Sequence, residues 1–328
     1  MTAIGRDFVS GIFANLDASW RPATRPVGFL WLSLASGAVL NAVAQLILVR
    51  HLDLASYGAL AAAFSAIAII TPLASLGLGG HVLQRFGEEG PAAKRWLYPS
   101  AQCLIIACSM AVAALAAWSF GAHTDAQIRR LAFLLIPWCV MQASSGFLYA
   151  LYQVESLYPQ LAAWQIAPNA SRLAAAAVAF MAGKSVEFVA GATSLAAAVI
   201  LLGQSTVFRR LSPGSDDASR PPLRSVLAGS WPFAASGSLF LIYYQSDIFL
   251  LAWLRGPLES APYAAASLPL TFLYHFPAAV YLQYLAPKLN RWAWHDPIRF
   301  RRVQGLALGI VTAFGVLSAI VIIALAPL

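Results

Sequence analysis

The sequence predicts an all-α membrane protein, a polytopic bundle of about nine transmembrane helices. Of the 328 residues, 60% are hydrophobic and 10% are charged, whereas soluble domains contain about 45–50% apolar and about 25% charged residues. Apolar runs of about 20 residues recur along the chain, long enough for a helix to cross a hydrocarbon core of about 30 Å. The alternating pattern of a membrane barrel is absent. The three cysteines lack metal-ligand spacing, so neither a metal site nor a disulfide framework is expected.

One long hydrophilic connection divides the apolar runs. Residues 1–26 carry apolar side chains at near-helical spacing, which predicts an interfacial segment on the cytoplasmic side. Residues 27–208 hold six spans and are expected to form an N-lobe. The segment 209–225 has the composition of a flexible cytoplasmic linker, and 226–328 holds three spans of a partial C-lobe. The nine expected spans are 27–49, 57–78, 98–120, 131–152, 160–182, 188–208, 226–254, 262–286 and 303–326.

The distribution of basic residues predicts the orientation. With a cytoplasmic N-terminus, 15 of the 21 Lys and Arg residues lie in cytoplasmic segments, five lie in the opposite loops, and Arg172 lies within a span. This bias agrees with the positive-inside rule. We expect cysteine-accessibility labelling to find the 209–224 loop cytoplasmic and the 255–260 turn periplasmic. Periplasmic labelling at Ser215 would contradict the topology.

Three ionisable residues inside spans are candidate site residues. Asp247 interrupts an apolar run in the seventh span. A charged group at membrane depth costs about 2.5–3.5 kcal/mol on insertion scales, so it usually faces a bundle interior or a wet cavity. Asp247 either acts on substrate or bonds Tyr243, Tyr244 or a neighbouring helix. Arg172 either holds a diphosphate by paired hydrogen bonds or bridges to Asp247. His275 is either a proton relay or ligand or a satisfied interior histidine.

Polar side chains also form stripes along two spans. In the first span Ser33, Gly37, Asn41 and Gln45 are spaced by four, and in the fifth Gln165, Asn169 and Arg172 share a face. Both helices are therefore expected to face something polar, with Asn41, Gln45 and Asn169 as candidate substrate contacts. Prolines such as Pro72, Pro137 and Pro168 are expected to kink their spans, and the Gly77–Gly80 run is expected to end a helix.

Three groups of residues are similar to a known family. They are the turn from Arg50-His51-Leu52 to Tyr57-Gly58, the helix end from Leu76-Gly77-Leu78 to Arg85, and the run from Trp231-Pro232 through Asp247 and Tyr263-Ala264-Ala265 to Pro287-Lys288-Leu289. Together they resemble the polysaccharide-transport branch of the multidrug/oligosaccharidyl-lipid/polysaccharide exporters.

The resemblance implies two six-helix lobes around a central cavity. It also implies flipping of an undecaprenyl-diphosphate-linked oligosaccharide across the bacterial inner membrane, for O-antigen or exopolysaccharide synthesis. Asp247 falls where these proteins often keep an acid in the seventh helix. Because the family usually has twelve or more helices, we expect this chain to be a truncated form of a longer flippase. Restoration of glycan export by this chain alone in a flippase-null strain would contradict that expectation.

Two other functions remain as alternatives. An ion-coupled small-molecule exporter of the multidrug type should have an acid-rich cavity, whereas the spans here hold one clear acid against Arg172 and His275. A membrane polymerase or ligase of the same pathway should have a large periplasmic loop, and the outside loops here are short. No Walker loop is present, so neither ATP hydrolysis nor a cofactor is expected.

The expected partners follow from the flippase hypothesis. They are the lipid-linked oligosaccharide, membrane lipids, and the polymerase and glycosyltransferases of the pathway. The net charge of +8 does not indicate nucleic-acid binding, because the basic residues lie between the apolar runs rather than along one soluble face.

Overall fold

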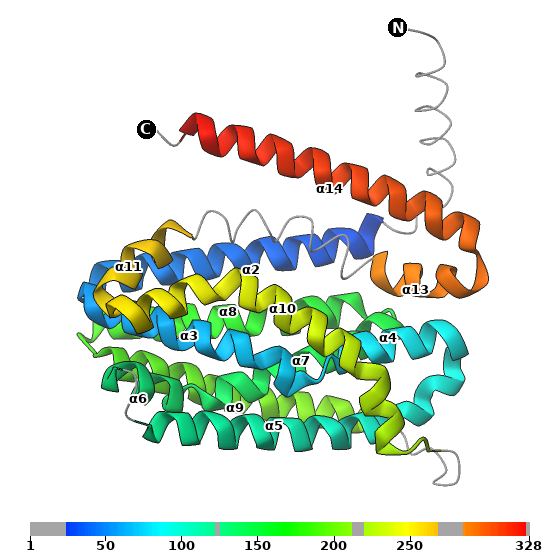
Figure 1. Cartoon of the computed structure of the whole chain (residues 1–328), viewed down its shortest axis with the longest axis horizontal. Coiled ribbons are helices and arrows are strands. Elements are labelled where there is room, and N and C mark those ends of the chain that lie inside the picture. The colour runs from blue at the N-terminus through cyan, green and yellow to red at the C-terminus, as the bar shows by residue number, and fades with distance from the viewer. Residues whose placement is uncertain (1–23, 122–124, 212–219, 268–284, 326–328) are drawn as a thin grey trace, which may run out of the picture.

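The computed structural model describes residues 24–121, 125–211, 220–267 and 285–325, and within these ranges it is a bundle of helices without strands (Figure 1). His275 and most of the predicted interfacial segment lie outside the described residues. The described helices are α2 (Thr24–His51), α3 (Leu54–Ser75), α4 (Leu78–Glu89), the 3-10 helix η2 (Gly90–Trp96), α5 (Leu97–Phe120), α6 (Ala126–Leu134), α7 (Ile136–Val154), α8 (Tyr158–Met181), α9 (Val186–Leu211), α10 (Leu223–Arg255), α11 (Pro257–Ala266), α13 (Ala286–His295) and α14 (Pro297–Leu325).

The helices agree with the predicted multi-pass membrane bundle. In the described part of the chain, five segments are long and apolar enough to cross a membrane, and the bent pair of α6 and α7 makes a sixth. The nine expected spans are more numerous for three reasons. The segment Leu54–Phe120 contains two of them, α8 carries a polar stripe that lowers its hydropathy, and most of 262–286 lies outside the described residues.

Local sequence explains where the helices break. Leu76 and Gly77 have left-handed φ values of 50° and 62°. Gly77 adopts this conformation without strain because glycine has no Cβ. The expected helix end is therefore present, but α4 begins directly afterwards at Leu78. Pro137 lies in the first turn of α7, where the α6–α7 pair bends by 49°. Asp53 caps α3 by accepting from the Ser56 backbone N–H at 3.1 Å, and hydrogen bonds to Ser56 lower the pKa of its carboxyl.

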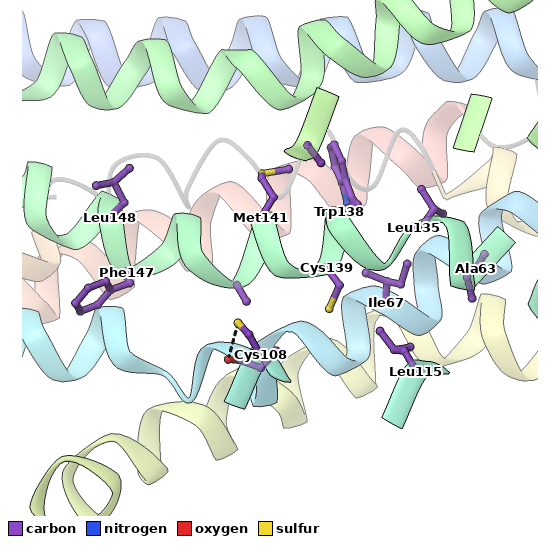
Figure 2. Packing of buried hydrophobic residues seen from close by; sticks show 14 of the residues in the cluster. Ala63, Ile67, Cys108, Leu115, Leu135, Trp138, Cys139, Met141, Phe147 and Leu148 are labelled. Carbon is purple, nitrogen blue, oxygen red and sulfur yellow. Dashed lines mark hydrogen bonds between the residues drawn. The ribbon is translucent and has the colours of Figure 1, made fainter. Parts of the chain in front are cut away.

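The core lies where α3, α5, α6 and α7 meet. Figure 2 shows Ile67, Leu115 and Cys139 converging there. Cys108 donates to the Ala74 carbonyl oxygen at 3.6 Å, and all three cysteines are buried and free. Alanines along α3 allow close approach of its neighbours, as small residues do between membrane helices.

The first two described helices after the 209–225 linker, α10 and α11, pack against α3. Ser65 on α3 donates to Gln245 Oε1 on α10 at 3.1 Å, and Gly58 at the start of α3 lies against the Pro257 carbonyl of α11. In contrast, α14 runs apart from the bundle and is joined to it through α13 (Figure 1). Only 6% of the apolar window of α14 is buried. In the described part of the chain, α3 therefore forms a large part of the contact between the two halves, and α4 and α5 also contribute to it.

Candidate functional site

Helices α2 and α8 lie side by side and run parallel. Ser33 Oγ donates to Gln165 Oε1 at 3.0 Å, and the side chain of Asn169 occupies the space where a Cβ on Gly37 would be. Near the other end, His51 Nε2 is 2.9 Å from the Lys184 carbonyl oxygen. In each of these contacts the two residue numbers differ by almost the same amount, as expected for parallel helices. We use the name α2/α8 seam for the two predicted stripes that this contact brings together: Ser33, Gly37, Asn41 and Gln45 on α2, and Gln165 and Asn169 on α8.

The two predicted polar stripes therefore face each other. Glycine at position 37 permits the close approach, since any larger side chain would meet Asn169 Nδ2. The same offset places Asn41 level with Arg172 and Leu173. The seam is only partly satisfied, because Asn41 Oδ1 and Gln165 Nε2 are buried without a hydrogen-bond partner in the structure. Such unsatisfied atoms cost about 1–3 kcal/mol each, so the seam has capacity for further hydrogen bonds.

Arg172 stacks on aromatic rings at the end of this stripe. Its guanidinium carbon lies 4.2 Å from the centroid of the Phe64 ring and 5.6 Å from that of Trp138. The two rings pack edge to face with centroids 5.9 Å apart. Among the described residues, no carboxylate lies within ion-pair distance of Arg172. Stacking fixes the guanidinium plane and leaves its N–H edges able to bind an anion in paired fashion.

Asp247 does not join Arg172. It is exposed on α10 and accepts a hydrogen bond from Tyr263 Oη on α11 at 2.7 Å. This contact is a hydrogen bond to a neighbouring helix, one of the predicted alternatives for Asp247. The other predicted contact, a salt bridge between Arg172 and Asp247, is not formed. The structure thus brings Asn41, Gln45, Asn169 and Arg172 along one pair of helices. It places Asp247 on α10, which packs mainly on α3, α4, α5 and α11.

One buried ionisable residue was not singled out from the sequence. His81 lies on α4 with none of its surface exposed. His81 lies in the Leu76–Arg85 segment. The sequence feature that could have identified it is a polar side chain within a run of glycine and apolar residues. The sequence could place His81 after a helix end, but it could not show that α10 covers it.

The comparisons with known proteins bear on the family and the fold of the chain. A family model described as polysaccharide biosynthesis protein matches residues 26–281. No curated protein sequence matches the chain.

Solved MATE transporters have a similar fold. One MATE structure, in complex with MaD3S, has a TM-score of 0.66 and 17% identity over 92% of this chain and 73% of its own. The eukaryotic MATE transporter AtDTX14 has a TM-score of 0.64 and 16% identity over 91% and 72%. For the MATE multidrug transporter DinF-BH in complex with R6G the values are 0.62 and 15% over 89% and 71%. At these identities the likeness shows the fold. Because the family model spans most of the sequence, the chain belongs to the polysaccharide biosynthesis protein family, in the same exporter superfamily as the MATE transporters.

Proposed function

We propose that this protein is a flippase that moves undecaprenyl-diphosphate-linked oligosaccharide across the bacterial inner membrane. The family match and the transporter fold support export of a saccharide-bearing substrate. The observation that carries the proposal is Arg172, a stacked guanidinium without an acidic partner among the described residues, at the end of a polar seam.

The residues of the seam suit the two parts of such a substrate. A diphosphate offers adjacent anionic oxygens, and a planar guanidinium binds them bidentately. Sugar hydroxyls donate and accept hydrogen bonds, which matches the amides of Asn41, Gln45 and Asn169. In this proposal Arg172 binds the diphosphate and the amides contact the sugar. Asp247 and His275 remain proposed as further substrate contacts.

The other two functions have less support. One of the similar structures is named as a multidrug transporter, and a cationic drug would require carboxylates at the site. The α2/α8 seam contains no carboxylate, and Asp247 lies on α10, outside this pair of helices. A polymerase or ligase is disfavoured because the family and the similar structures are transporters. The proposed partners remain the lipid-linked oligosaccharide, membrane lipids and the enzymes of its pathway.

A flipping assay in proteoliposomes tests the proposal. The protein is reconstituted with a fluorescent undecaprenyl-diphosphate oligosaccharide in both leaflets, and a membrane-impermeant reductant destroys the fluorophores of the outer leaflet. We expect the protected inner pool to become accessible only in vesicles that contain protein. The same vesicles loaded with a cationic dye should retain it. Release of the dye with no movement of the lipid-linked saccharide would contradict a flippase and favour the multidrug-type exporter.

A further inference from the structure

The buried histidine on α4 lies at the contact between the two halves of the chain. Its ring packs edge to face on Trp96, with centroids 5.3 Å apart. Across the contact is Gly229 of α10, where a Cβ would come within 2.5 Å of His81 Cε1 and 2.8 Å of Nδ1. The backbone of α10 at Gly229 therefore lies directly against the ring. Neither ring nitrogen has a hydrogen-bond partner of full geometry among the described residues, although the nearby Gly229 backbone favours the protonated ring.

The carboxylates near His81, Glu88 and Glu89, favour a charge on its ring, but each is already paired with an arginine. On its own helix Arg85 is the nearest cation, and its Nη1 is paired with Glu88 at 2.8 Å. Arg85 also stacks on Trp96, 4.4 Å from the ring centroid. Glu89, the last residue of α4, pairs with Arg95 of the adjoining η2 segment at 3.2 Å and accepts from Trp96 Nε1.

The other elements that pack on α4 add no acid toward the imidazole. The first turn of α10 contains no acidic residue and includes Arg224. From α13 the charged and titratable residues are Lys288, Arg291 and, at its exposed end, His295. The helix α7 carries no charged residue, and Glu155 at its end pairs with Lys94. Burial and a cationic neighbour both disfavour the protonated imidazole, so the closed α4–α10 contact holds His81 neutral.

We propose that His81 is a proton-binding site that couples protonation to separation of α4 from α10. When the two helices separate, water reaches the ring and can solvate the protonated imidazolium. When the helices close again, the ring must release the proton. The closed contact is therefore stable above the pH at which the hydrated ring titrates and loses population as the pH falls. A difference of one pKa unit between the two states changes their ratio about tenfold. The biological role of this switch rests on the proposed transport function, whereas the experiment that tests it does not.

Pulsed electron paramagnetic resonance on the full chain in lipid nanodiscs measures the contact without any substrate. Nitroxides are attached at Ala92→Cys on η2 and Ala228→Cys on α10, two exposed positions on either side of the contact. The three buried native cysteines are replaced by alanine. We expect a single short distance at pH 8 and, at pH 5, a second longer distance whose population rises about tenfold.

Two variants and one control decide the result. His81→Gln keeps a polar side chain that does not titrate, and His81→Phe keeps the edge contact with Trp96; each should give the pH 8 distance at both pH values. His295→Gln, at the exposed end of α13, should respond to pH like the parent. If the parent shows the same distance at both pH values, or if the longer distance persists at pH 5 in either His81 variant, His81 is not the proton-binding site. Neither result would bear on the flipping assay.

Discussion

Replacing Arg172 with alanine should abolish transport of the lipid-linked oligosaccharide while the protein still inserts into the membrane. The change removes the cation that lies over Phe64 and with it two charge-assisted hydrogen bonds to the diphosphate. Hydrogen bonds to charged groups contribute about 1.5–3 kcal/mol each, so the rate at limiting substrate should fall at least about 100-fold. The flipping assay measures this directly. Arg172→Lys should restore only part of the rate, because an ammonium is a point charge without the planar fork.

Arg299 provides a matched control for this experiment. It also stacks on an aromatic ring, 4.4 Å from the Trp292 centroid, but it lies at the start of α14, away from the seam. Arg299→Ala should therefore leave the rate within about twofold of the parent, since exposed pairs contribute little. Normal transport by Arg172→Ala would show that Arg172 is structural. The same conclusion would follow if adding Asp247→Ala restored what the Arg172 change had lost.

The fold was largely predictable because hydrophobic runs and breaking residues act locally. A span shows itself by its apolar length whatever its neighbours are, and Pro137 bends the α6–α7 pair through the amide proton it lacks. The end of α3 followed from the glycine run in the same way. What local signals could not give is that the chain resumes as α4 straight after Gly77. At this glycine the backbone of α10 packs against the chain, a contact that local sequence does not reveal.

The site was predictable only as faces of helices. Spacing by four showed that Asn41 and Asn169 each lie on a polar stripe, but periodicity cannot say which stripe meets which. Their pairing depends on the parallel packing of α2 and α8, which brings together residues about 130 positions apart. The same limit explains Asp247. Its partner Tyr263 lies 16 residues away across a helix break, so the contact follows from how α11 folds back, not from either helix alone.

Adding a methyl group at Gly58 should strongly destabilise the contact between α3 and α11. The glycine is buried, and a Cβ there would overlap the carbonyl oxygen of Pro257 and approach Ser260 Oγ to 3.0 Å. The overlapped atom is backbone and cannot rotate away, so α11 must move. Overpacking costs about 1–3 kcal/mol and sometimes more. Thermal unfolding of Gly58→Ala in detergent should therefore begin several degrees below the parent.

The sign of this effect distinguishes packing from helix propensity. Alanine is favoured over glycine inside a helix by about 1 kcal/mol, so without a clash Gly58→Ala should raise the unfolding temperature. Gly191→Ala on α9 isolates this gain, because a Cβ there meets nothing within 4 Å, and we expect that variant to equal or exceed the parent. If both variants shift upward together, α11 does not press on α3 at Gly58. A loss confined to Gly58→Ala instead shows that the second half of the chain is held on α3 through this glycine.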